Sequence, residues 1–147
     1  MKINDDNIWP YDFIIGPKFK TFINNIPDAV IISDQEGRII AFNDVTTILL
    51  NYTREQLLNL VIEDLVPSDV IEHKKLRNKY FKNPRPRILG KRNINLNIIA
   101  NDHVIIPMDA SLFSIKTEKG LVAINIIRDI SDKKMQEEEL VKQALYD

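Results

Sequence analysis

The 147-residue sequence contains no cysteine. This absence excludes disulfide bonds, thiol catalysis, cysteine-ligated metals and any photochemistry that depends on a cysteinyl-flavin bond. The sequence also lacks a run of 18 or more apolar residues, and its N-terminal stretch is too acidic and polar for a signal peptide. We therefore expect a cytoplasmic location and no membrane contact within this chain.

A surplus of charge is missing too, because 20 Lys and Arg residues stand against 21 Asp and Glu residues, and the net charge is -1. A chain with this balance has no overall field that attracts nucleic acid. The local basic run at residues 74–87 lacks the interleaved aromatic residues of a surface that stacks bases. With 44% hydrophobic and 28% charged residues, the composition is that of one globular domain with extensions. We expect no nucleic-acid partner.

The first third of the sequence predicts an N-terminal extension, a helix and a β-hairpin. Residues 1–17 end in Gly-Pro, a boundary signal, and their apolar side chains predict packing on the domain or on a second copy. Apolar residues recur at helical spacing over residues 18–26. A β-branched run at 29–33, a turn ending in Gly37 and a returning run at 38–42 predict two paired strands.

Short helices are predicted between this hairpin and Pro67. Thr53 and Gln56 have the spacing of a capping box at the start of one of these helices. Ser68 is placed to cap a longer helix, which is expected to end near Phe81 because a proline-rich stretch follows at 83–86.

Three strands and a terminal helix complete the pattern. Apolar and polar residues alternate at 93–98, and apolar stretches at 104–115 and 121–127 flank a turn. Pro107 cannot donate a hydrogen bond to a ladder, so we expect an edge or a bulge there. Ser131 is placed to cap the final helix. This order predicts an α+β fold, a five-stranded antiparallel sheet with short helices on one face.

Several stretches carry a family resemblance: IPDAVIISDQEGRIIAFN, NYTREQLLN, NPRPRILG, VIIPMDASLFSI and INIIRDIS. In this order and spacing they resemble the PAS domain family over residues 19–131. The resemblance implies a PAS fold with a sensory domain at 18–130, between the extension at 1–17 and an output helix at 131–147. It also implies a bacterial signal-transduction domain that is not an enzyme, in which the sheet and central helices enclose a small pocket.

Two asparagines depart from the family pattern. Asn51 and Asn59 stand where PAS domains usually have glycine. Because asparagine tolerates a left-handed backbone better than other residues with a Cβ, we expect both turns to survive.

His73 is the residue with the sharpest functional hypothesis. By the resemblance, it lies where haem-binding PAS oxygen sensors place the histidine that binds iron, with Lys79 and Arg87 where those proteins neutralise the haem propionates. Asn93 stands where such sensors usually keep an arginine, and PAS domains without haem also carry a histidine at this place. Haem ligation and a hydrogen-bonding or surface role both stay open for His73.

The apolar residues of the candidate pocket come from the predicted strands and the long helix. The wall is expected to contain Ile31, Phe42, Leu65, Leu76, Ile88, Leu96, Met108, Ala110, Leu112, Ile124 and Ile126, with Ile88, Ala110 and Leu112 on the gas side of a bound haem. A plain hydrophobic core explains the same residues. No nucleophile, base or paired carboxylates have a catalytic arrangement, and the identity of any small-molecule ligand stays unknown.

The segment Arg128-Asp129-Ile130-Ser131 resembles the motif with which PAS domains end their last strand and begin an output helix. The resemblance implies a signal relay to a C-terminal effector domain of the diguanylate cyclase or histidine kinase type. The apolar side of the following helix predicts a short parallel coiled coil in a homodimer. A ligand-free dimerisation scaffold is the alternative hypothesis.

Overall fold

The computed structural model of the chain describes residues 7–67, 69–89 and 96–146. The predicted helix cap at Ser68 and the residue Asn93 lie outside these described residues.

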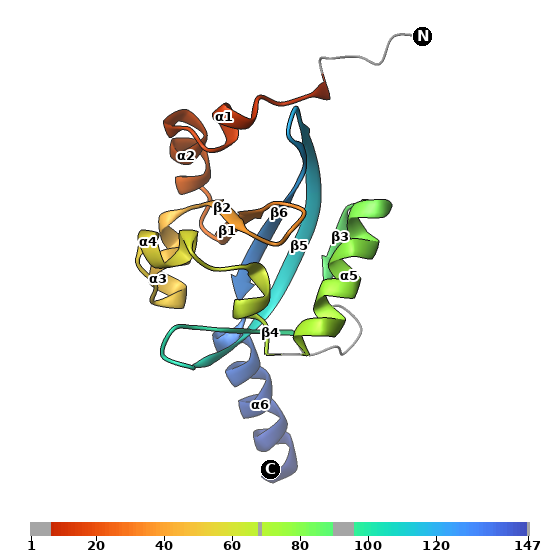
Figure 1. Ribbon diagram of the computed structural model, residues 1–147. Coiled ribbons are helices and arrows are strands. Elements are labelled where there is room, and N and C mark those ends of the chain that lie inside the picture. The colour runs from red at the N-terminus through yellow and green to blue at the C-terminus, as the bar shows by residue number, and fades with distance from the viewer. Residues whose placement is uncertain (1–6, 68, 90–95, 147) are drawn as a thin grey trace.

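The described residues form a six-stranded antiparallel sheet at the centre of the molecule (Figure 1). The strands are β1 (Ala29–Ser33), β2 (Ile39–Phe42), β3 (Arg87–Leu89), β4 (Leu96–Ile99), β5 (Ile105–Thr117) and β6 (Gly120–Asp129). Their order is β2-β1-β6-β5-β3, and β4 also pairs with β5. The α+β prediction is confirmed, but the sequence analysis missed β3. Three residues are too few to show a period of two, and only their pairing with β5 makes them a strand.

Strands β5 and β6 form the longest ladder, from the pair Met108 and Asp129 to the pair Thr117 and Gly120. Pro107 lies one residue beyond this ladder, so its missing N–H interrupts no bond to β6. Its carbonyl oxygen instead accepts a hydrogen bond of 3.0 Å from the N–H of Ile130. The proline therefore lies where β5 stops pairing with β6, in agreement with the edge or bulge expected at this position.

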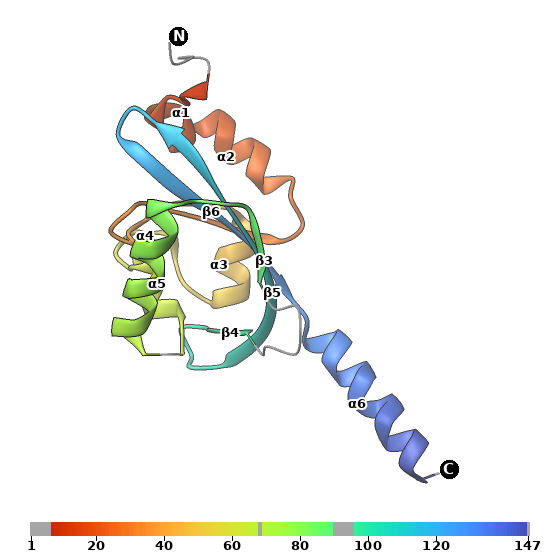
Figure 2. The same cartoon turned by 90° about the vertical axis from the view of Figure 1, so that its right-hand side faces the viewer.

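Four short helical segments lie on one face of the sheet, hereafter the inner face (Figure 2). They are α3 (Asp44–Leu50), α4 (Arg54–Leu58), the 3-10 helix η2 (Ile62–Leu65) and α5 (Val70–Lys82). The capping box of Thr53 and Gln56 at the start of α4 is confirmed. Asn51 ends α3 in a left-handed conformation with φ of 57°, as expected, whereas Asn59 has φ of -98° and needs no such freedom.

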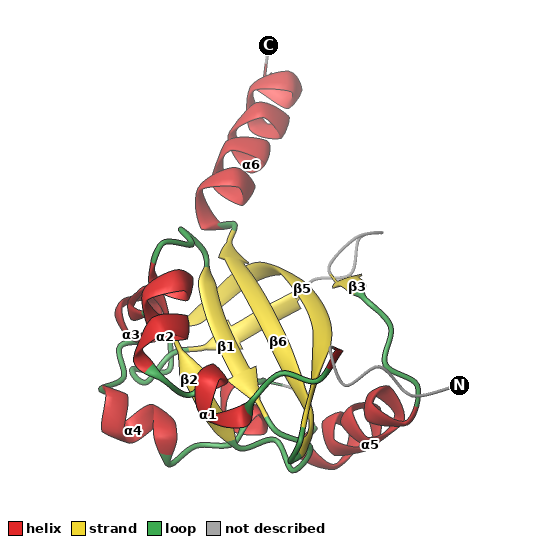
Figure 3. Cartoon of the chain, turned by 90° about the horizontal axis from the view of Figure 1, so that it is seen from above, coloured by secondary structure: helices red, strands yellow, loops and turns green. Residues whose placement is uncertain are grey.

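The N-terminal segment covers the opposite, outer face of the sheet (Figure 3), so the helices do not all lie on one face. Its helices are α1 (Tyr11–Ile14) and α2 (Pro17–Asn24). Ile14, Phe19 and Ile23 are buried there against Val30 and Val122 of the sheet. Among the described residues, the extension thus packs on its own domain, one of the two alternatives left by the sequence.

Asn43 connects the two layers of helices to the sheet, and its side chain is fully buried. Its amide group donates to the carbonyl oxygens of Ile23 and Asp28, each at 2.9 Å. Its carbonyl oxygen accepts from the N–H of Val30 at 2.9 Å and from the hydroxyl of Thr46 at 2.8 Å. One side chain thereby joins the end of α2, the start of β1 and the first turn of α3.

We predict that Asn43→Ala lowers the free energy of unfolding by about 3 kcal/mol, because it leaves several buried polar groups without partners. Urea denaturation of the two proteins would measure the difference. Asn25→Ala serves as the matched control, because Asn25 makes one exposed hydrogen bond to Thr21, and it should change stability by less than about 0.5 kcal/mol. Equal effects of the two substitutions would contradict the role given to Asn43.

Candidate functional site

The inner face of the sheet carries part of the predicted pocket wall. Ile31, Phe42, Leu65 and Ala110 are buried in one apolar cluster with residues of α3, α4 and β4, and Met108 packs against it. This cluster fills the inner face near β4. The five predicted wall residues therefore come together, and their surroundings are those of a hydrophobic core.

Two predicted wall residues, Ile124 and Ile126, lie on the other face. In the β5–β6 ladder, Ile124 pairs with Phe113 and Ile126 pairs with Ser111, whereas Ala110 pairs with Ile127. Because paired residues of an antiparallel sheet point to the same face and neighbours alternate, Ile124 and Ile126 face outward. Both pack in the outer cluster beneath the N-terminal helices. The prediction that they line the inner pocket is wrong.

Ile88 of β3 also points to the outer face, because it pairs with Ser111, which in turn pairs with the outward-facing Ile126. The prediction that Ile88 lines the inner pocket is therefore wrong, and its side chain is 62% exposed. Leu96 and Leu112 belong to the inner face and are half-buried. Leu76 on α5 is 59% exposed, so it presents apolar surface to solvent.

Asn125 is a polar residue of the inner face that the sequence analysis overlooked. It pairs with Leu112 in the ladder, and its amide donates a hydrogen bond of 3.1 Å to the carbonyl oxygen of Ile31. The alternation of β6 could have revealed it, because it stands between the outward-facing Ile124 and Ile126. Asn125 places an amide group beside the half-buried Leu112.

His73 lies on the side of α5 that faces η2. Its Nδ1 is 3.1 Å from Oε2 of Glu63, and 26% of its side chain is exposed. The guanidinium of Arg77, one helical turn further along α5, forms an ion pair with Oε1 of the same carboxylate. Only 1% of the Glu63 side chain and 12% of the Arg77 side chain are exposed. A buried carboxylate thus binds two side chains of one helix face.

Gly37 completes this cluster from the turn between β1 and β2. It has φ of +84°, and a Cβ at this position would collide with Nη1 of Arg77. Its carbonyl oxygen accepts a 2.7 Å hydrogen bond from the N–H of Ile62, at the start of η2. The turn, η2 and α5 therefore meet around the carboxylate of Glu63, a contact that the sequence analysis did not foresee.

The contact with Glu63 gives His73 a hydrogen-bonding role through Nδ1. A carboxylate at this nitrogen also orients histidines that bind a metal through Nε2, so the contact is compatible with both hypotheses for His73. Lys79 is exposed, and the guanidinium of Arg87 lies 5.8 Å from the ring centroid of Tyr80. Haem ligation stays a hypothesis, which an absorption spectrum with added hemin would test against the variant His73→Ala.

Burial lowers the pKa of His73 below its ordinary value of 6.5, since the charged imidazolium loses solvent. The carboxylate of Glu63 does not reverse this effect, because Arg77 already neutralises it. Below about pH 6.5 this histidine becomes protonated in the unfolded chain but stays neutral to a lower pH in the folded protein. The free energy of unfolding therefore decreases as the pH falls.

We predict that His73→Gln reduces the acid sensitivity of the fold. Between about pH 7.5 and 5.5, the wild type should lose stability relative to the variant by at most about 1.4 kcal/mol per pH unit, the maximum for one proton. Urea denaturation across this range would measure it. His103→Asn is the matched control, because His103 lies in an exposed turn with φ of 63° that asparagine tolerates. Parallel curves for wild type and His73→Gln would refute the prediction.

The predicted relay segment connects the sheet to the terminal helix α6 (Ser131–Tyr146) through a single residue, Ile130. The N–H of Ile130 donates to Pro107 in β5, and its carbonyl oxygen accepts a 2.9 Å bond from the N–H of Lys134 in α6. Oδ1 of Asp129 accepts a 2.8 Å hydrogen bond from the N–H of Ser131. Ser131 was expected to cap α6, but it is the first helical residue and its hydroxyl donates to Asp129. The carboxylate of Asp129 therefore takes the capping role.

Arg128, the first residue of the segment, forms an ion pair with Asp28 at 3.2 Å, next to the start of β1. Beyond Ser131, none of the described residues 131–146 is buried, and α6 projects away from the sheet (Figure 3). The described residues contain no cluster of three or more His, Asp or Glu side chains that could hold a metal ion. Within the same residues, every helix is too short or too polar to cross a bilayer.

Comparison with known proteins identifies the family. A sequence model described as PAS domain matches residues 27–132. The methyl sulfide methyltransferase-associated sensor of Methanosarcina acetivorans is 24% identical over 123 residues, which cover 82% of this chain but only 12% of that protein. The chain thus corresponds to a small part of that relative's length.

Solved structures share the fold. The PAS domain of a protein from Desulfitobacterium hafniense has a TM-score of 0.64 at 23% identity, covering 75% of this chain and 99% of that one. The PAS domain of an HTR-like protein from Haloarcula marismortui has a TM-score of 0.65 at 18% identity, covering 77% and 89%. Because the family match spans the whole sheet, the inner helices and the start of α6, the chain belongs to the PAS domain family, the sensory domains of signalling proteins.

Proposed function

We propose that this PAS domain is a cytoplasmic regulatory module that passes a change in its sheet through α6 to a C-terminal effector domain. The observation that carries the proposal is the junction at Ile130. Both backbone groups of this residue are hydrogen-bonded, one to β5 and the other to the first turn of α6. A displacement of β5 or β6 therefore moves the start of the helix, with no flexible linker to absorb it.

A second copy of the chain is the proposed partner of α6. The helix has 16 residues, and its apolar residues Met135, Leu140, Val141 and Leu145 are exposed. A helix of this length without tertiary packing is marginal in water. Packing of the apolar sides of two such helices in a homodimer would stabilise both and give the effector domains a defined arrangement.

A small ligand is proposed to act at the end of the inner face next to α5. There Leu76 of α5 is exposed, Leu112 is half-buried, and the amide of Asn125 lies beside Leu112. A ligand that buries this apolar surface would favour one position of α5 over others, and a differential affinity of this kind is what shifts a two-state equilibrium. The effector is proposed to be a diguanylate cyclase or a histidine kinase.

The competing function is a dimerisation scaffold without a ligand. It is favoured by the filled half of the inner face, where Ile31, Leu50, Leu57 and Leu65 are fully buried in one core. Native mass spectrometry of the freshly purified protein discriminates the two. The ligand-binding function predicts a dimer with an extra mass that is released on denaturation, and a dimer of bare chain mass would favour the scaffold.

We predict that the rotational phase of α6 controls the output of the full-length protein. Two residues inserted after Ser131 turn the rest of the helix by about 200°, whereas seven residues turn it by about 20° less than two full turns. The two-residue insertion should abolish the regulated change in effector activity, and the seven-residue insertion should retain it. Autophosphorylation or cyclic dinucleotide synthesis would be measured, according to the effector. Unchanged regulation after both insertions would contradict the relay.

A further inference from the structure

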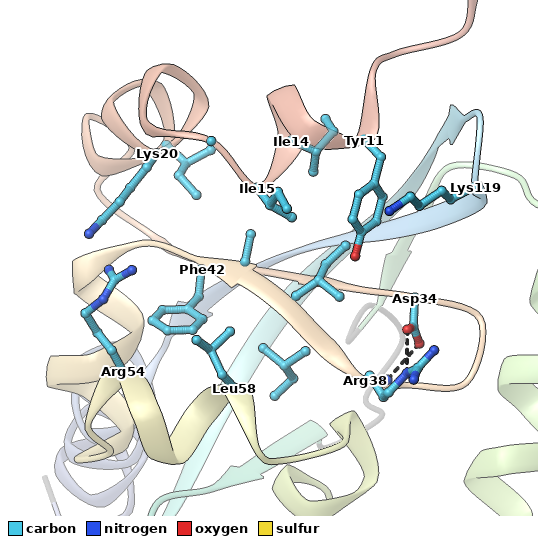
Figure 4. A pocket seen from close by; sticks show the side chains of 15 residues that line it. Tyr11, Ile14, Ile15, Lys20, Asp34, Arg38, Phe42, Arg54, Leu58 and Lys119 are labelled. Atoms are coloured by element: carbon cyan, nitrogen blue, oxygen red, sulfur yellow. Dashed lines mark hydrogen bonds and ion pairs between the residues drawn. The ribbon is translucent and has the colours of Figure 1, made fainter.

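A groove of about 660 Å³ lies along β2, an edge strand of the sheet (Figure 4). The N-terminal segment forms one wall with Ile15 and the first turns of α2, and α4 forms the other wall with Leu58. Its apolar floor includes Phe42 of β2. The groove is separate from the inner-face surface discussed above, since it opens at the opposite edge of the sheet from α5 and β3.

The two ends of this groove differ in how their charged groups are paired. At the end near the β1–β2 turn, Arg38 forms an ion pair with Asp34, and Nζ of Lys119 lies 4.4 Å from the ring centroid of Tyr11. At the other end, Lys20 of α2 and Arg54 of α4 point toward one another in Figure 4.

Among the residues that the structure describes, neither Lys20 nor Arg54 has a carboxylate partner. The guanidinium of Arg54 instead lies over the ring of Phe42, 5.4 Å from its centroid. Two cations that converge without an anion repel one another, and an anion between them would turn that repulsion into two favourable contacts. The apolar residues Ile15 and Leu58, both exposed, begin directly beside this cationic end.

The geometry points to a binding site for a small amphipathic carboxylate, with the carboxylate between Lys20 and Arg54 and the apolar body over Ile15, Leu58 and the partly buried Ile40 and Ala41 of β2. The groove has the volume of ordinary small-molecule sites, which span roughly 300–1,000 Å³. A purely polar anion would leave the apolar floor of the groove in contact with water, and an uncharged apolar molecule would leave the two cations without an anionic partner. This site goes beyond the proposed function, because a molecule bound here would connect α2 on the outer face with α4 on the inner face.

Binding of octanoate to the intact chain, measured by calorimetry and by amide chemical shifts, tests the site. Octanoate has both required parts, whereas 1-octanol has only the apolar body and acetate only the charge. We expect octanoate to bind at least about tenfold more tightly than either, with shifts at Ile15, Phe42 and Leu58. Failure of octanoate to bind at millimolar concentration, or shifts confined to β5 and α5, would overturn the proposal.

Charge-removing variants separate this site from non-specific attraction. Lys20→Gln and Arg54→Gln should each weaken octanoate binding by about tenfold while leaving the weak binding of 1-octanol unchanged. Lys18→Gln is the matched control, because Lys18 is an exposed residue of the same helix α2 that does not line the groove. An equal loss of octanoate affinity in all three variants would show attraction by surface charge alone and reject the site. Unchanged regulation after both helix insertions would contradict the relay but leave octanoate binding untouched, so the two proposals fail separately.

Discussion

The antiparallel register between β5 and β6 is the constraint on which the rest of this structure depends. Once Ala110 pairs with Ile127 and Phe113 with Ile124, every side chain of the two longest strands is assigned to one face or the other. The inner set packs against α3, α4 and η2, and the outer set packs against α1 and α2. A shift of one residue would exchange the two sets and remove both cores at once. The same ladder ends at Asp129, where α6 begins.

Two buried polar side chains give this layered arrangement its connections. Asn43 satisfies backbone groups at the end of α2, the start of β1 and the first turn of α3. Glu63 joins α5 to η2 through His73 and Arg77, beneath the turn at Gly37. Each side chain supplies the hydrogen-bond or ion-pair partner that buried polar groups would otherwise find in water. Each therefore fixes the position of a helix relative to the sheet. Asn43 thus fixes α2 and α3, and Glu63 fixes α5, at defined points of the sheet.

The buried apolar cluster and the exposed apolar surfaces lie at different places on the sheet, and only the exposed surfaces are available for binding. The inner face carries a buried apolar cluster near β4 and the exposed Leu76 near α5, while the edge at β2 carries a groove with two cations at one end. A ligand at either place would bridge elements that contact one another little in its absence. Both places lie on the sheet whose strands β5 and β6 lead to Ile130 and the first turn of α6.

The sequence by itself determined the α+β class, the capping box at Thr53, the left-handed turn at Asn51 and the start of the terminal helix within one residue, because each depends on neighbours in the chain. It placed Met108 and Ala110 together on the inner face through their alternation in β5. It could not assign Ile124, because β6 is covered on both faces. The alternation separates Ile124 from Asn125, but it does not say which of the two sides is the inner face. Only the tertiary structure decided that phase, the contact of His73 with Glu63 and the position of Lys20 and Arg54 at one end of the same groove, because each brings together residues that are distant in the sequence.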